Sequence, residues 1–242
     1  MIVICYGMPK SASTFTVQLA TALVDCQHNQ SKLYEYLPEG VNPSAKNKIV
    51  YIQELDKVIC DLVDRVPSDR VLVVKTHCPL SKPIESALES GNALAIVNYR
   101  NPYDIMVSLK DVGERERLKE KSKQRPEFAW IKSIDDTKRN IRGIVSTAKT
   151  WLDKKSESLL CISYQSIEKT PLNVALDIDK FIQLNLKPSS IRTIVDGFIT
   201  DKSKIGEYNV GVSGRGAEIS FTESDKKLVE EMDSFIYLYL KK

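Results

Sequence analysis

The first residues suited to chemistry are a lysine and three hydroxyl residues within five positions: Lys10, Ser11, Ser13 and Thr14. An apolar, β-branched run at 2–6 precedes them and predicts a buried strand, and an apolar helical pattern begins directly after them. The first amides of a helix have no intrahelical partner and carry partial positive charge, so a lysine and hydroxyls beside them favour an anion. This turn therefore predicts a site for a phosphate-like group, with an ordinary polar turn as the alternative.

A second candidate pair, Lys75 and His77, follows an apolar run at 71–74. A neutral histidine, with a pKa near ~6.5, is well suited to removing a proton from a hydroxyl near neutral pH. The chain has two histidines, and the other, His28, lies in a polar stretch where we expect it to be exposed. If the first two strands are parallel, His77 lies at the same sheet edge as Lys10. The pattern predicts a general base, with a structural histidine as the alternative.

A third candidate pair, Arg100 and Ser108, follows the apolar run at 93–97. The asparagine–proline pair at 101–102 is a strong helix start, because asparagine can cap and proline suits the first helical position. Ser108 then lies about two turns into that helix and can face the same crevice as Arg100. A guanidinium and a hydroxyl together can hold a phosphate. The alternative is that Arg100 pairs with a carboxylate such as Asp104.

The three stretches, in this order, resemble the cofactor-binding motifs of PAPS-dependent sulfotransferases. Residues 9–15 are similar to the family's P-K-S-G-[ST]-T-[WF] loop, with Ala12 in place of the customary glycine and Phe15 in place of the commoner tryptophan. Residues 75–79 are similar to K-[TS]-H-x-P, and residues 100–108 to R-[ND]-P-x-D-x-x-x-S. On these motifs the chain is identified as a member of the family.

The resemblance implies a role for each matched residue. His77 would take the acceptor's proton, Lys10 would stabilise charge on the leaving phosphate oxygen, and Lys75 would lie near the transferred sulfuryl group. Arg100 and Ser108 would hold the 3′-phosphate of PAPS. No metal ion would be required, because sulfate carries less charge than phosphate. The loop residues expected to hold the 5′-phosphosulfate are Lys10, Ser11, Ala12, Ser13, Thr14 and Phe15.

Two further stretches resemble the family less closely. Residues 162–167 are similar to L-x-Y-E-D-L, whose tyrosine lies near the adenine, and Tyr164 is predicted there, with a core aromatic as the alternative. The glycine-rich stretch 206–216 is similar to a late loop that folds over the 3′-phosphate, although the family's R-K pair is missing. Arg215 is predicted as its substitute. The binding residues expected in this loop are Gly214, Arg215 and Gly216.

Apolar runs and helical patterns alternate along the chain, which predicts an α/β fold with a mainly parallel sheet and helices on both faces. The resemblance implies a P-loop-NTPase-like, three-layer domain that spans residues 1–242. Two segments are expected to be loops: a turn-rich stretch at 27–48, and a charge-dense stretch at 114–125 that we expect to be solvated. The strands are predicted at 2–6, 71–74, 93–97 and 159–162, and the helices at 50–66, 83–89, 102–110, 130–155, 171–184 and from 223.

The composition is that of an ordinary globular protein. Hydrophobic residues make up 42% of the 242 residues, and the net charge is +3, so no nucleic-acid or membrane footprint is visible. The five cysteines are scattered and never spaced as C-x-x-C, which favours reduced core thiols over disulfides or zinc. The start of the sequence lacks a signal-peptide pattern, and we expect a cytoplasmic protein.

The expected reaction is transfer of a sulfuryl group from PAPS to a hydroxyl or amine, leaving adenosine 3′,5′-bisphosphate (PAP). Polar segments around His77 favour a polar small-molecule acceptor, whose identity the sequence leaves open, as it does the oligomeric state. One alternative is a small-metabolite kinase on the same fold, but no late loop lysine of the G-x-x-x-x-G-K-[ST] type is present. The other alternative is a non-catalytic nucleotide-binding relative. The segment 114–133 could also act as a lid over substrate.

Overall fold

The computed structural model describes residues 1–44, 48–201, 205 and 212–240. Its centre is a sheet of four parallel strands in the order β2-β1-β3-β4. Each strand lies within two residues of the apolar run that predicts it, so the expected parallel α/β sheet is confirmed. The strands are β1 (Ile2–Gly7), β2 (Leu72–Thr76), β3 (Ala93–Tyr99) and β4 (Leu159–Ser163).

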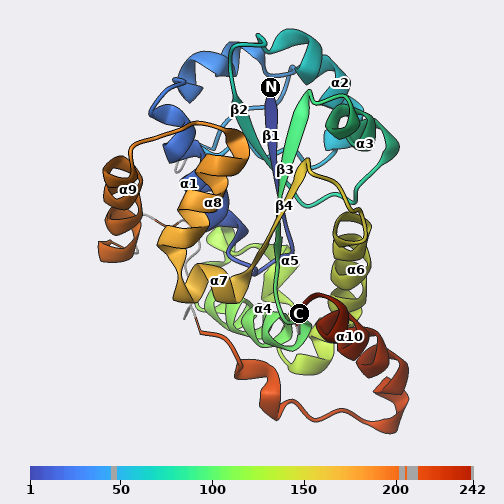
Figure 1. Cartoon of the computed structure of the whole chain (residues 1–242). Helices are drawn as coiled ribbons and strands as arrows, with labels where there is room; N and C mark the ends of the chain where they lie inside the picture. Colours follow the sequence, from blue (N-terminus) through green and yellow to red (C-terminus); the bar gives the residue numbers. More distant parts are fainter. Residues whose placement is uncertain (45–47, 202–204, 206–211, 241–242) are drawn as a thin grey trace.

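Helices cover both faces of the sheet, as Figure 1 shows. Successive side chains of a strand point to opposite faces, so Ile4 and Tyr6 of β1 belong to one apolar core and Val3 and Cys5 to the other. Two cores on two faces make the three-layer arrangement. The first core includes residues of α2 (Leu55–Arg65), α3 (Lys82–Glu89) and α6 (Ile134–Leu152), and the second includes residues of α1 (Ser13–Asp25), α8 (Pro171–Ile182) and α9 (Pro188–Thr200).

The first core is tied to the end of β2 by a buried tryptophan. Trp151 of α6 stacks on Tyr6, with 5.1 Å between the ring centroids. Its indole Nε1 donates a hydrogen bond of 2.9 Å to the carbonyl oxygen of Cys78, which follows His77 in the chain. Helix α6 therefore helps to hold the segment that carries the histidine.

The strand order determines where polar residues can gather. The central strand β1 pairs with β2 on one side and with β3 on the other. The connections that follow β1 and β2 therefore lead to strands on opposite sides of β1. In open parallel sheets, ligands bind outside the carboxyl ends of the strands at such a switch point. The residues that follow β1, β2 and β3 therefore meet at one edge of the sheet.

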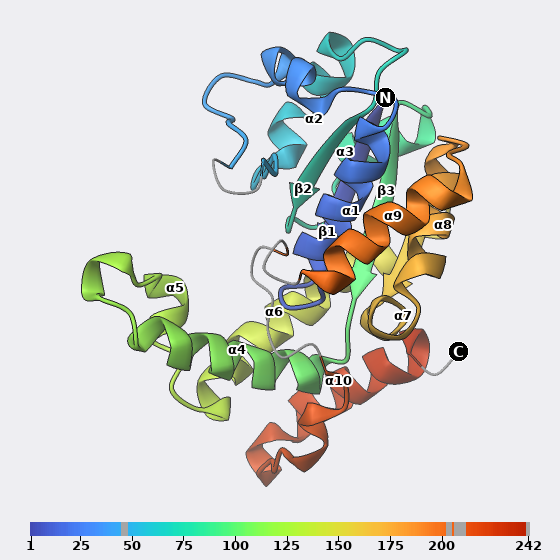
Figure 2. The ribbon, with the colours of Figure 1, turned by 90° about the vertical axis from the view of Figure 1, so that its left-hand side faces the viewer.

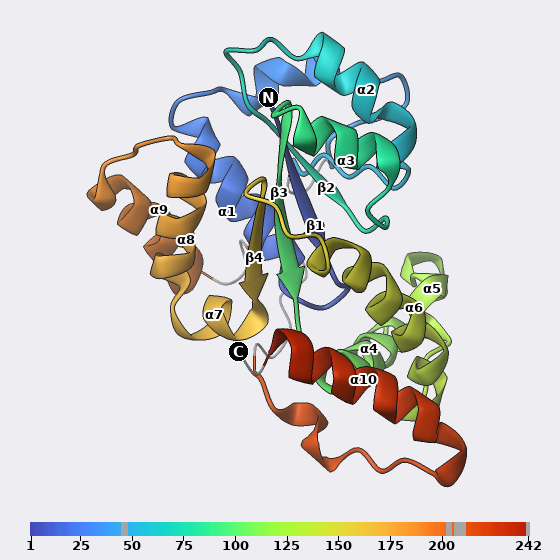
Figure 3. The same cartoon turned by 45° about the vertical axis from the view of Figure 1, so that its right-hand side comes forward.

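Three helices lie beyond that edge, in the lower half of the molecule as Figures 2 and 3 show it. They are α4 (Pro102–Arg117), α5 (Pro126–Ala129) and α10 (Lys226–Tyr239). The short helix α7 (Tyr164–Lys169) follows β4 directly. The short 3-10 helices are η1 (Gln30–Tyr36), η2 (Lys121–Lys123), η4 (Arg215–Glu218) and η5 (Glu223–Asp225).

Helix α4 begins as predicted and ends later than predicted. The side chain of Asn101 accepts a hydrogen bond of 2.9 Å from the backbone N–H of Tyr103, which confirms the predicted cap. The helix was expected to end near Lys110, but it continues to Arg117. Its buried face continues with residues three or four apart, at Leu109, Val112 and Glu116. Because Glu116 is charged, the apolar periodicity of the sequence does not show that this last position is buried.

The charge-dense stretch at 114–125 is mostly exposed, as expected, but it is not a plain loop: α4 continues to Arg117, η2 covers Lys121–Lys123, and Glu116 is buried. Glu116 is 1% exposed and accepts hydrogen bonds from the Arg125 guanidinium and backbone and from the Lys119 ammonium. Burial alone would raise the pKa of Glu116, but these hydrogen bonds outweigh burial and lower the pKa to about 2. The carboxylate thus fixes the turn that leads into α5.

Other differences lie at element boundaries. The helix expected from residue 50 begins at Leu55, because the backbone at 50–52 pairs with Lys75 at the end of β2. The stretch at 27–48, expected to be a loop, contains η1. The helix expected from residue 130 begins at Ile134, after a capping box formed by Ser133 and Asp136. Helices α7 and α9 were not predicted.

Within the described ranges, none of the helices combines the length and the apolar character that a membrane crossing demands.

Candidate functional site

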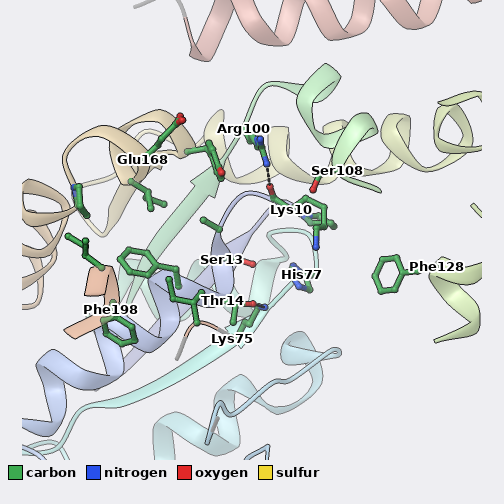
Figure 4. A pocket seen from close by; sticks show the side chains of 18 residues that line it. Lys10, Ser13, Thr14, Lys75, His77, Arg100, Ser108, Phe128, Glu168 and Phe198 are labelled. Atoms are coloured by element: carbon green, nitrogen blue, oxygen red, sulfur yellow. Dashed lines mark hydrogen bonds between the residues drawn. The ribbon is translucent and has the colours of Figure 1, made fainter. Parts of the chain in front are cut away.

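A cavity of about 490 Å³ opens at the carboxyl edge of the sheet. Figure 4 shows Lys10, Lys75 and His77 near the middle of the cavity, with Phe198 to one side and Phe128 to the other. The cavity is lined by most of the predicted residues: Lys10, Ala12, Ser13, Thr14, Phe15, Lys75, His77, Arg100, Ser108 and Tyr164. Segments far apart in the sequence are therefore brought together as the strand order requires.

The loop between β1 and α1 (residues 8–12) has an unusual backbone. Lys10 and Ala12 both have positive φ angles, of 67° and 64°, in the left-handed region that favours glycine. The loop brings the start of α1 close to the end of β1, because a Cβ added at Gly7 would lie 2.2 Å from the Cβ of Ser13. This compact turn places the first residues of α1 along the cavity.

Ser11 is the one predicted loop residue that does not line the cavity. Its side chain is fully buried, and its Oγ donates a hydrogen bond of 2.7 Å to the carbonyl oxygen of Met8. The two left-handed residues on either side turn it inward. The expected role of the Ser11 hydroxyl as an anion donor therefore differs from what the structure shows, since this hydroxyl braces the loop.

Lys75 and His77 are held by the backbone around them. The N–H and carbonyl of Lys75 bond to the carbonyl of Val50 and the N–H of Ile52, and its Nζ lies 3.0 Å from Thr14 Oγ1. His77 Nδ1 lies 2.6 Å from the carbonyl oxygen of Gly7, which can only accept, so the proton of a neutral ring is on Nδ1. The lone pair is then on Nε2, as a general base requires.

Arg100 lies at the centre of a dense set of contacts. Its Nη1 donates to the carbonyl oxygen of Lys10 at 2.9 Å and its Nη2 to that of Val212 at 2.8 Å. The guanidinium carbon lies 3.7 Å from the centroid of the Tyr164 ring. Arg100 is 5% exposed, and burial lowers the pKa of its guanidinium from the usual range. Nε has no hydrogen-bond partner within the described part of the chain, and its nearest carboxylate oxygen, on Asp104, is 3.9 Å away.

Asp104 forms a long ion pair with Arg100, the alternative raised from the sequence, and it also holds the late loop. Its two oxygens accept the backbone N–H groups of Gly214, at 2.9 Å, and Gly216, at 2.8 Å. Gly216 packs so closely that an added Cβ would lie 2.4 Å from the Cβ of Tyr103. Beside these contacts, the Glu168 carboxylate accepts hydrogen bonds from the backbone and hydroxyl of Ser213.

None of the three residues predicted in the late loop lines the cavity. Gly214 and Gly216 are bound to Asp104, and the guanidinium of Arg215 forms an ion pair of 2.6 Å with Asp111. The loop therefore reaches the cavity margin through Val212, on Arg100, rather than through Arg215. The glycines expected at 206 and 211 lie outside the described residues.

Much of the apolar wall of the cavity was not predicted from the sequence. Phe198 of α9 meets Phe15 edge to face, with 5.6 Å between ring centroids, and the neighbouring Ile199 remains 49% exposed. Phe128, from α5, forms the opposite wall. The signal in the sequence was the adjacent pair Phe198 and Ile199, but α9, which carries them, was not predicted. Phe128 belongs to the 114–133 segment that was expected to wall the acceptor site. The lining residues that were missed are Pro9, Ile167, Glu168, Pro171, Phe198, Ile199 and Ile205.

No group of three or more histidine, cysteine, aspartate or glutamate side chains is arranged to hold a metal ion among the residues described. Polar contacts in the cavity instead come from lysine, arginine, histidine and hydroxyl groups, a donor set suited to a multiply charged anion. The apolar wall beside them is suited to a planar ring.

Comparisons with solved structures agree with this fold. The fold is similar to mouse sulfotransferase SULT7A1 in complex with PAP, with a TM-score of 0.62, 14% identity, and coverage of 99% of this chain and 85% of that one. It is also similar to retinol dehydratase bound to retinol and PAP (TM-score 0.57, 16% identity, coverage 100% and 81%) and bound to androsterone and PAP (TM-score 0.54, 17% identity, coverage 100% and 81%).

Comparisons of the sequence give two further results. No curated protein matches the chain significantly. The family model described as "Sulfotransferase domain", however, matches residues 2–217, which include all three strand-end motifs and the late loop. The chain therefore belongs to the sulfotransferase family.

Proposed function

We propose that the protein transfers a sulfuryl group from PAPS to a hydroxyl or amine of a polar small molecule and releases PAP. One observation carries the proposal: Lys10, Lys75, His77, Arg100 and Ser108, from separate strand ends, line a single cavity. The solved relatives named above were crystallised with PAP, and two of those complexes also hold retinol or androsterone, which supports a small-molecule acceptor.

The residues present suit PAPS. The buried Nε of Arg100 has no hydrogen-bond partner among the described residues, which is expected of a donor whose acceptor is a ligand oxygen. Ser108, 1% exposed in total but reaching the cavity, would share the 3′-phosphate with it. Phe15, Tyr164 and Phe198 would enclose the adenine. The amides at the start of α1 and the Lys10 ammonium would hold the phosphosulfate.

PAPS supplies an activated sulfuryl group, so the protein's task is positioning, proton removal and charge stabilisation. As the new sulfur–oxygen or sulfur–nitrogen bond forms, the bond from sulfur to the phosphate oxygen breaks. His77 Nε2 would take the acceptor's proton. Lys10 would stabilise the charge that develops on the phosphate oxygen, and Lys75, oriented by Thr14, would stabilise the equatorial sulfuryl oxygens.

The acceptor would enter between His77 and Phe128. Figure 4 shows Phe128 across the cavity from His77. The Tyr51 ring, 42% exposed, lies 5.6 Å from the His77 ring and covers another side. Lys10 and Lys75 line the cavity together with His77, and these charged groups are why we retain a polar acceptor as part of the proposal.

Titration calorimetry tests the cofactor first. We expect micromolar PAP binding, and weak ATP binding that does not depend on magnesium. Tight, magnesium-dependent ATP binding with no response to PAP would overturn the proposal and favour the kinase. Binding of neither would favour a non-catalytic relative.

Replacing each of the two histidines in turn tests whether His77 removes the acceptor's proton. We expect His77→Ala to abolish transfer from labelled PAPS to a screened acceptor while PAP affinity changes little. His28→Ala, at the far end of α1, should retain full activity. Equal activity in the two variants would remove His77 from the mechanism.

A further inference from the structure

A buried polar pair lies beneath the loop between β1 and α1. Asn98, near the end of β3, and Thr16, in the first turn of α1, are both fully buried. Neither lines the cavity, so neither contacts a ligand there. Polar side chains in such a position destabilise the fold unless their hydrogen bonds are made.

The pair forms a chain of hydrogen bonds that ends on the loop. Asn98 Nδ2 donates to Thr16 Oγ1 at 2.9 Å, and Thr16 Oγ1 in turn lies 3.5 Å from the carbonyl oxygen of Ala12. The backbone N–H of Thr16 donates to the same carbonyl at 3.1 Å. The carbonyl of Asn98 also receives the N–H of Met8 at 3.0 Å and approaches Ser11 Oγ at 3.5 Å. Asn98 therefore contacts the loop from two directions.

Ala12, where this series of hydrogen bonds ends, has a backbone conformation that alanine rarely adopts. Ala12, with φ at 64°, lies in the left-handed region and lines the cavity. Such a conformation persists only where the surroundings hold it. Thr16 holds it through the carbonyl of Ala12, and Asn98 orients Thr16.

The geometry points to Asn98 and Thr16 as positioning residues that keep Ala12 left-handed and thereby aim the loop amides at the anion. The consequence for PAPS binding rests on the proposed function. Asn98 Oδ1 has no hydrogen-bond partner in the described ranges, so the amide does not satisfy all of its own groups. A buried amide oxygen without a partner lowers the stability of the fold, so we infer that Asn98 serves to set the loop conformation.

Two substitutions at Thr16 separate positioning from packing. Thr16→Val keeps the shape and removes the hydroxyl, whereas Thr16→Ser keeps the hydroxyl and removes a methyl group. We expect Thr16→Val to weaken PAP binding roughly tenfold, as the loss of one buried hydrogen bond implies. Thr16→Ser should stay within about twofold of the wild type. Equal affinities in the two variants would overturn the inference, even if both melt at a lower temperature.

Repeating the two Thr16 substitutions in an Ala12→Gly background tests whether Thr16 acts through the left-handed conformation of residue 12. Glycine adopts the left-handed conformation without strain, so the tenfold loss caused by Thr16→Val should shrink to about twofold there. An undiminished loss would show that Thr16 does not act through the conformation of residue 12.

Hydrogen exchange of the unliganded proteins keeps this inference separate from the proposed function. The peptide 8–16 should exchange faster in Thr16→Val than in Thr16→Ser, whether or not PAP is the ligand. If the wild type fails to bind PAP, the proposed function falls and the exchange rates alone decide the inference. Equal exchange rates would then overturn it.

Discussion

The bond between Asp104 and the late loop can be tested by a single change of charge. Asp104 is 3% exposed, and each of its oxygens accepts one backbone N–H, from Gly214 or Gly216. Asp104→Asn keeps one acceptor oxygen but places an amide NH₂ against the other N–H. One charge-assisted hydrogen bond is lost and a buried N–H is left unsatisfied, which together cost about 2–4 kcal/mol. For a chain of this size the melting temperature should fall by roughly 5–15 °C.

Asp111→Asn is the matched control, because Asp111 binds the same loop at a more exposed place. Its ion pair with Arg215 has side chains 21% and 26% exposed, so the substitution should cost at most ~1 kcal/mol. Differential scanning calorimetry compares the global stabilities, and hydrogen exchange of residues 212–218 detects local detachment of the loop. If Asp104→Asn melts no lower than the control and its loop exchanges no faster, the reasoning about the buried carboxylate is refuted.

Three further predictions follow from contacts described above. Gly7→Ala should lower the melting temperature by several degrees and weaken PAP binding, because the added Cβ would lie 2.2 Å from the Cβ of Ser13; calorimetry that shows both unchanged would contradict this close packing. Glu116→Gln should lower the free energy of unfolding by about 1–3 kcal/mol near neutral pH. The pKa of Glu116 is lowered from 4.5 to about 2, so the difference in unfolding free energy from the wild type should shrink as the pH falls between those values. Denaturant unfolding at several pH values measures it, and a difference that does not depend on pH would refute it. Phe128→Ala should raise the KM for the acceptor roughly tenfold or more while PAP affinity is unchanged, and a selective loss of PAP affinity in titrations would place Phe128 on the cofactor side.

The sheet could be predicted from the sequence because its strands are continuous apolar runs. Parallel strands buried on both faces carry the same signal at every position, so β1 and β3 were recognisable without any knowledge of their neighbours. The end of α4 was not recognisable, because its last buried position is Glu116, whose carboxylate is stabilised there by Lys119 and by Arg125, nine residues later. Such a partner follows from the fold and not from local periodicity.

The same distinction applies to the site. Lys10, His77 and Arg100 could be predicted because each follows a strand end, and parallel strands bring their carboxyl ends to one edge. The inward turn of the Ser11 hydroxyl depends on a backbone conformation that residue types do not reveal. The pairing of Arg215 with Asp111 depends on how the late loop packs against α4, which is a property of the tertiary structure.

The stack of Trp151 on Tyr6 has a practical consequence for spectroscopy. The chain contains two tryptophans, and Trp151 is fully buried beside β1 while Trp130, at the end of α5, is 41% exposed. An aqueous quencher such as iodide should therefore reach Trp130 and spare Trp151, and the unquenched emission should be shifted to the blue. Fluorescence can thus follow the core and the α5 wall of the cavity separately, in the unmodified protein and without a label.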